Sequence, residues 1–241
     1  MIEDLERTLT EYGLVCRVGG EIAYTTQGKQ FKSEVEDIAR NRLTSIQAEE
    51  VELPTLVDYS KLKLDRRISI VRHFFCFRTS SRDKTGFLLT RTGEELAADY
   101  FFQTKTEGII YQIRTKFRDE NGEELDFLKR REFTMLDVYS FDSNSSEAQK
   151  TYQRMKRCFA DILSDLEIPY STKISGDVCS GVQSEEFICE DDRMRGVELG
   201  HIYQLGNLYT KQYNLENVMM GSYVFGIDRL FAAISIIGGG K

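Results

Sequence analysis

The chain has 241 residues, of which 41% are hydrophobic and 29% charged, and its formal net charge is -7. This ordinary composition excludes collagen-like, low-complexity and disordered classes, and the acidic excess argues against a nonspecific nucleic-acid binder. No apolar run reaches the roughly 20 residues of a membrane helix, and the acidic start Met1–Glu6 is unlike a secretory signal. We therefore expect one large domain over residues 1–241, in the cytoplasm and without a membrane partner.

The five cysteines are widely spaced and form no C-x-x-C pair. This pattern argues against a disulfide framework and against a zinc ribbon, and it favours mostly buried thiols.

Two helices are predicted in the first quarter of the chain. Apolar residues at 2, 5 and 9 indicate a short helix that ends in a turn at Gly13, and a stripe at three- and four-residue spacing indicates a longer helix over 31–46. Residues 18–20 and 27–28 contain glycine and are predicted as turns.

Strands are expected next. Residues 51–57 alternate as a strand does, and because Pro54 cannot donate to a ladder, this strand should lie at an edge or an interface. Residues 73–78 and 86–90 flank a polar turn and predict a hairpin. His73 matches no site pattern and is interpreted as a core histidine.

Thr92 and Glu95 have the spacing of a capping box, which predicts a helix whose N-cap is Thr92. Two β-rich segments follow, at 109–118 and 131–141, and a charged stretch joins them. We expect these two segments to be antiparallel neighbours.

The last third predicts a helix over 152–166, strands around 170 and 187, strands over 197–205 and 223–227, and a final helix over 228–237. Many strands with few intervening helices indicate an α+β fold with a mostly antiparallel sheet.

The first indication of a binding site is at the open end of the predicted hairpin, which is formed by Phe117–Glu120 and Lys129–Phe133. These segments could bind a nucleotide through three kinds of side chain. An arginine can bind a phosphate, a glutamate can accept a hydrogen bond from an exocyclic amine, and an aromatic ring can stack on a base. The alternative is a solvated charged rim beside a turn.

A second signal is the segment Gly221–Arg229, in which Arg229 falls in the first turn of an apolar helix. A cation there opposes the helix dipole, so either a bound anion or a structural ion pair should offset it.

These residues carry a resemblance. Pro54 after a long helix, Phe117–Glu120 with Arg131–Phe133, and Gly226–Arg229 resemble, in order, motifs 1, 2 and 3 of class II aminoacyl-tRNA synthetases.

Three further segments resemble prolyl-tRNA synthetases in particular. Thr92–Glu95 is similar to their Thr-His-Glu-Glu element, Arg131–Phe141 to the strand after motif 2, and Gly196–Gly206 to another signature of that family. The resemblance implies a six-stranded antiparallel sheet flanked by helices, and a homodimer formed through motif 1, here residues 49–56.

The resemblance also implies ligand roles. Arg118 would bind the α-phosphate of ATP and the amino acid carboxylate, Glu120 the adenine amino group, and Arg229 the γ-phosphate, while Phe133 would stack on adenine. Lys129 belongs to the same ATP-binding set. Catalysis would come from positioning and from phosphate neutralisation by Arg118, Arg229 and Mg²⁺.

Amino acid recognition is implied for Thr92, Glu94 and His201 together with Arg118, with Glu94 as partner of a cationic amine. Glu198 falls where a Mg²⁺ contact is expected, and Gln204 where a ribose contact is expected. His201 is interpreted as a recognition residue, with a satisfied core histidine as its alternative.

The chain also departs from the resembled family. The motif 2 loop, Glu120–Asp126, is acidic, which disfavours a phosphate backbone. Lys129 stands in place of an arginine, and Arg91 and Gly93 stand in place of proline and histidine. We further expect no anticodon-binding domain and no editing insertion.

We therefore expect an enzyme that activates proline or a proline-like amino acid as its adenylate. The acceptor would be a carrier protein or a small molecule rather than a complete ordinary tRNA. The alternatives are an inactive paralogue that acts as a binding or regulatory subunit, and a truncated prolyl-tRNA synthetase that does charge tRNA.

Overall fold

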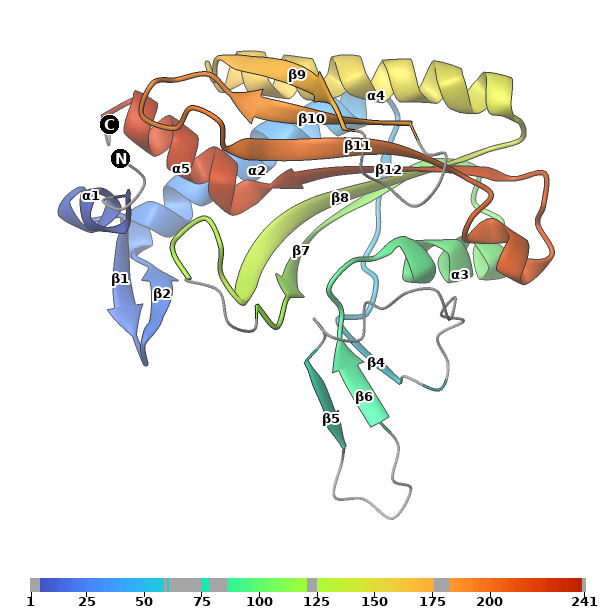
Figure 1. Cartoon of the computed structure of the whole chain (residues 1–241), viewed down its shortest axis with the longest axis horizontal. Coiled ribbons are helices and arrows are strands. Elements are labelled where there is room, and N and C mark those ends of the chain that lie inside the picture. The colour runs from blue at the N-terminus through green and yellow to red at the C-terminus, as the bar shows by residue number, and fades with distance from the viewer. Residues whose placement is uncertain are drawn as a thin grey trace.

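The computed structural model describes residues 5–58, 60, 75–78, 86–120, 125–175 and 183–239. A seven-stranded sheet with the order β3-β7-β8-β12-β11-β10-β9 forms its centre (Figure 1). All neighbouring strands are antiparallel except β3 and β7, which are parallel. The strands are β3 (Glu49–Glu50), β7 (Gly108–Phe117), β8 (Glu132–Asp142), β9 (Tyr170–Ile174), β10 (Gln183–Cys189), β11 (Glu198–Gly206) and β12 (Met219–Gly226).

The large sheet has seven strands, whereas six were expected. The strand that sequence periodicity does not detect is β3, which has two residues and pairs with β7. Two residues are too few to show an alternating pattern, so only the pairing reveals this strand. The mostly antiparallel α+β architecture itself is confirmed.

The prediction of one continuous strand over residues 51–57 was wrong. The chain leaves the large sheet after β3 and enters a separate three-stranded sheet as β4 (Leu56–Asp58). Pro54 lies exposed between the two sheets. Its missing N–H donor and fixed φ suit a crossover segment better than a strand interior.

The turn expected at residues 18–20 and the strand pairing expected of the hairpin at 73–90 are confirmed. β1 (Val15–Val18) and β2 (Glu21–Tyr24) pair across Gly19 and Gly20, both of which have positive φ. In the three-stranded sheet, β5 (Cys76–Arg78) pairs antiparallel with β6 (Gly86–Leu89). The turn expected between them and His73 lie outside the described residues.

Helices lie on both sides of the large sheet. Helices α2 (Thr26–Ser45), α4 (Ser145–Asp165) and α5 (Ile227–Ile237) share one hydrophobic core with it, and α1 (Leu5–Glu11) joins this core at its margin. Helix α3 (Glu94–Thr104) packs on the opposite face beside the short 3₁₀ helix η4 (Thr210–Tyr213). Figure 1 shows α3 and the three-stranded sheet on the side of the large sheet away from α4.

The alternation of side chains along β8 separates the two faces. Leu136 and Val138 join the core beneath α2, α4 and α5, whereas Tyr139 and Phe141 join the second core beneath α3. Asp137 shares the face of Tyr139, because alternate residues of a strand point to the same side. We call the face opposite α4, which carries the buried side chain of Asp137, the polar face of the sheet.

Gly28 was wrongly expected to mark a turn. Helix α2 starts at Thr26, and the N-cap Thr25 accepts a hydrogen bond from the Gly28 N–H at 3.0 Å. A Cβ at Gly28 would lie 1.8 Å from the carbonyl oxygen of Leu14. The glycine therefore reflects a close approach of two backbones inside the first helical turn.

The expected N-cap of α3 was also wrong. Helix α3 starts at Glu94 after Gly93, and no side chain provides a cap hydrogen bond. Thr92 lies one position too early to cap this helix, and its side chain lines the cavity described below.

Three cysteines fall in the region whose side chains are described, and all are free thiols. Cys158 and Cys189 are buried, as expected, whereas Cys16 is exposed. No helix in the described ranges combines the length and apolar character that a membrane crossing requires.

Candidate active site

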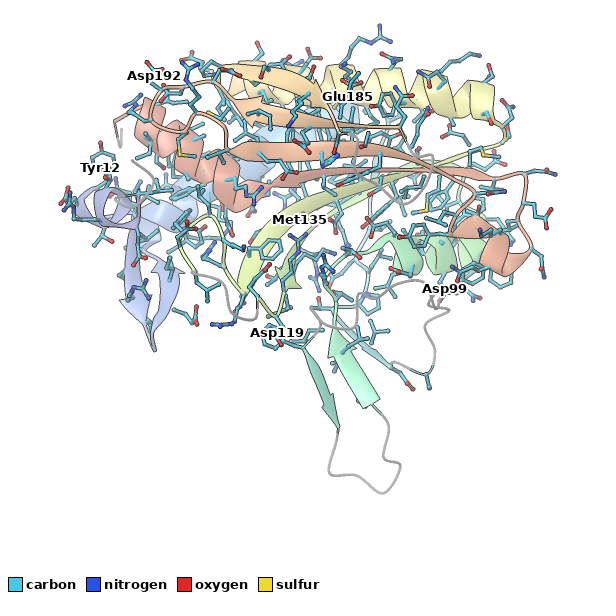
Figure 2. All side chains as sticks on the ribbon, in the orientation of Figure 1. Tyr12, Asp99, Asp119, Met135, Glu185 and Asp192 are labelled. Carbon is cyan, nitrogen blue, oxygen red and sulfur yellow. The ribbon has the colours of Figure 1, made fainter. Side chains whose placement is uncertain are left out.

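A cavity of about 590 Å³ lies on the polar face of the large sheet. It is bounded by the ends of β7 and β8, by β11, by the start of α5 and by the segment that precedes α3. Eight of the ten predicted site residues line it: Thr92, Arg118, Glu120, Lys129, Phe133, Glu198, His201 and Arg229. Figure 2 labels Met135, another lining residue, beside β8.

Arg118 and Phe133 occupy the mouth of the β7–β8 hairpin. The Arg118 N–H donates to the Arg131 carbonyl at 2.9 Å, which continues the ladder past the end of both strands. The Arg118 guanidinium lies 4.8 Å from the centre of the Phe133 ring. A planar cation and an aromatic face are thus placed side by side in the cavity.

The cavity concentrates positive charge around Arg118. Burial lowers the pKa of Arg118, and the charges of Arg91 and Arg229 lower it further. Clustered guanidinium groups repel one another unless an anion binds between them. The arrangement therefore favours a phosphate or a carboxylate as ligand.

Arg229 is held at the first turn of α5 by groups from two other segments. Its Nη1 donates to the Glu198 carbonyl at 2.7 Å, and its Nε donates to the Leu128 carbonyl at 3.5 Å. The Glu198 carboxylate lies 3.6 Å from Nη1. The structure thus contains the ion pair that the sequence left as an alternative, and it places that pair at the cavity wall.

Glu198 and His201 form a pair on β11. His201 Nδ1 lies 3.2 Å from Glu198 Oε1, and the imidazole ring stacks on Tyr203 with centroids 4.0 Å apart. Burial alone would raise the pKa of Glu198, but the His201 hydrogen bond and the charge of Arg229 hold it below its ordinary value. The carboxylate is therefore kept ionised beside the arginines.

His201 is not a fully satisfied core histidine. Its Nε2 is buried and has no hydrogen-bond partner among the residues that the structure describes. A buried polar atom without a partner is costly unless a ligand or water meets it. This favours the recognition role over the alternative that was left open.

Glu94 lies next to this cavity but is not among its lining residues. Its Oε1 accepts a hydrogen bond from Ser222 Oγ at 3.1 Å, while its Oε2 is buried and has no partner within the described ranges. Ser222 pairs with Tyr203 in the sheet register, so Glu94 is held over the strands that carry His201. A buried carboxylate oxygen in this position suits a cationic amine.

Gln204 is the predicted residue that the structure separates from the site. Its amide donates to Gln149 Oε1 of α4 at 2.8 Å, and it does not line the cavity. The strand period explains this, because Tyr203 faces the cavity and its neighbour therefore faces the helices.

A metal ligand set is not evident from protein groups alone. Among the described residues, no group of three His, Cys, Asp or Glu side chains could hold an ion. A single carboxylate such as Glu198 fits Mg²⁺ held mainly by substrate phosphates and water.

A buried charge cluster surrounds Asp228, which was not among the predicted site residues. Lys32 Nζ lies 2.9 Å from Oδ1, Tyr24 donates to the same oxygen at 2.6 Å, and the Thr134 N–H donates to Oδ2 at 2.9 Å. Arg130 also donates to Oδ2. The cluster ties α2, β2 and β8 to the residue that precedes Arg229.

A signal for this cluster was present in the sequence. Lys32 falls in register with the buried stripe of Val35, Ala39 and Leu43 on α2. A lysine inside an apolar stripe must find a buried anion.

A second polar cluster supports the segment that carries Thr92 and Glu94. Lys116 Nζ lies 2.5 Å from Asp137 Oδ2, and both side chains are almost fully buried. A Cβ at Gly93 would lie 2.4 Å from the Tyr139 hydroxyl and 3.4 Å from Lys116 Nζ. The glycine thus lets this segment lie directly on the polar face of the sheet.

The comparisons agree with this geometry. No protein-family model matches the chain. It is 30% identical over 204 residues to a proline--tRNA ligase of Corynebacterium aurimucosum, covering 80% of this chain and 34% of the relative. It is 29% identical over 218 residues to that of Mycolicibacterium smegmatis, covering 85% and 37%. The chain spans about a third of the length of these relatives.

Solved structures show the same fold. Giardia lamblia prolyl-tRNA synthetase in complex with prolyl-adenylate matches with a TM-score of 0.83 and 16% identity over 96% of this chain and 52% of that chain. The Cryptosporidium parvum enzyme complexed with L-proline and AMP matches with a TM-score of 0.81 and 14% identity over 97% and 53%. The likeness in sequence and the likeness in fold together support a class II aminoacyl-tRNA synthetase core that is similar to the catalytic core of prolyl-tRNA synthetases.

Proposed function

We propose that this chain uses ATP to activate an amino acid, proline or a close analogue, as its adenylate. The observation that carries the proposal is the convergence of Arg118, Glu120, Phe133 and Arg229 on one cavity. A protein that had lost catalysis would have no reason to keep these groups together. The matched relatives are named as proline ligases, and one matched structure contains prolyl-adenylate.

In this reaction the amino acid carboxylate attacks the α-phosphorus of ATP, and pyrophosphate leaves. Arg118 would bind the α-phosphate and Arg229 the γ-phosphate, so that the charge that develops in the transition state is neutralised. Glu120 and Phe133 would bind the adenine. Mg²⁺, held by the phosphates and Glu198, would add further charge neutralisation. No side chain needs to move a proton in the attack itself.

The amino acid would lie between α3 and β11. The unpartnered Oε2 of Glu94 would accept from the amine, and the unpartnered Nε2 of His201 would face the same ligand. Thr92 lines the cavity next to them. These groups would fix the amine and thereby orient the carboxylate toward the phosphate.

The test is ATP–pyrophosphate exchange by the purified protein with each standard amino acid. We expect exchange with proline above all others, its loss in Arg118→Gln, and its retention in Arg157→Gln, an exposed arginine on α4. Absence of exchange with every amino acid would contradict the proposal.

For the acceptor, we propose a carrier protein or a small molecule rather than a complete tRNA. The support is the acidic motif 2 loop, of which residues 121–124 lie outside the described part of the chain. Asp126 is described, and it accepts from the backbone of Leu128 and Lys129 at 2.8 and 2.7 Å. Incubation with ATP, proline and total tRNA should give no charged tRNA. Efficient charging would instead favour a truncated synthetase of the ordinary type.

We also propose a homodimer that forms through residues 49–56. The short edge strand β3 and Leu56, whose side chain is 49% exposed, support this proposal, since such an edge requires a cover. Mass measurement at micromolar concentration should give a dimer that Leu56→Asp weakens. A wild-type monomer would overturn the proposal.

An inactive binding paralogue is the second candidate. It is favoured by the position of Gln204 outside the cavity and by the replacement of the family histidine by Gly93. ATP binding without exchange would identify this case.

A further inference from the structure

We infer that Arg91 is an additional substrate-binding residue, which contacts the carboxylate of the amino acid beside Arg118. The inference rests on the proposed function and extends it. Arg91 stands where the resembled element has proline, so the motif comparison assigns it no role.

Arg91 has the environment of a ligand-binding group. It lies between β6 and α3, next to Thr92, and it lines the same cavity as Arg118 and Arg229. Its Nε is buried and has no hydrogen-bond partner in the described part of the chain. Withdrawing a guanidinium N–H from water without a partner is costly, so an anion that enters the cavity would meet a donor already in place.

The surroundings of Arg91 indicate which anion it meets. Arg229 is held at the start of α5 by the Glu198 carbonyl and carboxylate and by the Leu128 carbonyl. Arg91 instead adjoins Thr92 and the start of α3, where Glu94 offers a carboxylate oxygen to an amine. Arg91 and Arg229 both lie close enough to Arg118 to lower its pKa. Arg91 belongs to the segment of Thr92 and Glu94, for which we propose amino acid binding, whereas Arg229 belongs to α5, for which we propose phosphate binding.

Adenylate formation explains why a second guanidinium would help there. The carboxylate and the α-phosphate are both anionic and must come within bonding distance, so their repulsion has to be offset. One guanidinium fork can hold a single anion in bidentate geometry. With Arg91 on the carboxylate, the fork of Arg118 is free for the α-phosphate.

The test compares L-proline with L-prolinol, which keeps the ring and the amine but carries an alcohol in place of the carboxylate. Binding of each is measured by calorimetry without ATP, so that no adenylate forms, in the wild type, Arg91→Gln and Arg91→Lys, with Arg157→Gln as matched control. A lost charge-assisted hydrogen bond should weaken proline binding by roughly 10- to 100-fold in Arg91→Gln, while prolinol binding should change less than about threefold. Arg91→Lys should recover part of the proline affinity.

Three outcomes would overturn the inference. Equal weakening of both ligands would show a merely structural role, and unchanged proline binding would show no contact. A selective loss of ATP affinity would place Arg91 on the phosphate. The failure of the proposed function itself looks different, because the wild type would then give no ATP–pyrophosphate exchange with proline, whatever Arg91 contacts.

Discussion

Glu95 gives a pH-dependent prediction that can be worked from the structure. It lies in the first turn of α3, where burial and the charge of Glu94 raise its pKa from 4.5 to about 7. The folded protein therefore holds this proton more tightly than the unfolded chain does. Stability falls as the pH rises between these two values, and the loss is complete above about pH 7.

The magnitude follows from the two pKa values. The full shift corresponds to about 3 kcal/mol, of which about 2 kcal/mol falls between roughly pH 5.5 and pH 8. Glu95→Gln cannot ionise and removes this contribution. The stability of the variant relative to the wild type should thus rise by about 2 kcal/mol across that interval.

Urea unfolding at both pH values measures the difference. Glu34→Gln, an exposed glutamate on α2, is the control for the loss of one charge. If wild type and Glu95→Gln show the same pH dependence, Glu95 does not hold its proton in the folded state, and the reasoning from its burial is refuted.

Three further variants test the site and its supports. Arg229→Ala should weaken ATP binding by about 2 to 5 kcal/mol, because a phosphate loses its charge partner, and unchanged binding by calorimetry would remove Arg229 from the nucleotide site. Gly28→Ala should lower the free energy of unfolding by about 3 kcal/mol, because the added Cβ would clash with the Leu14 carbonyl. This loss should exceed the gain from the better helix propensity of alanine. A higher melting temperature in the variant would contradict this prediction. Lys116→Met should cost about 3 to 5 kcal/mol, because the buried Asp137 carboxylate keeps its hydrogen bond from Gln112 but loses its cation. An undiminished unfolding midpoint would show that this ion pair is not needed.

Long periodic elements were predictable from the sequence. The stripe of Tyr152, Met155 and Phe159 located α4, although the helix begins earlier, at Ser145, where the Asn144 side chain accepts two backbone N–H groups. The pairing of β7 with β8 was equally readable, because both strands are long and rich in β-formers.

The errors occurred where local and tertiary causes look alike in a sequence. Gly28 has the signature of a turn, but its reason is the approach of the Leu14 backbone. The strand β3 exists only through its pairing with β7. The order and spacing of the motifs predicted most of the residues that line the cavity. They could not predict that the Gln204 side chain points to α4, because the face of the sheet on which a side chain lies depends on strand register.

The central claim is that the residues of this cavity catalyse the formation of an aminoacyl-adenylate from an amino acid and ATP. Trapping with hydroxylamine tests it most directly, because an aminoacyl-adenylate reacts to give a hydroxamate whether or not the natural acceptor is known. With ATP, Mg²⁺ and proline, the account predicts prolyl-hydroxamate from the wild type and a loss of at least about 100-fold in Arg118→Gln. ATP binding without hydroxamate from any amino acid would contradict the claim.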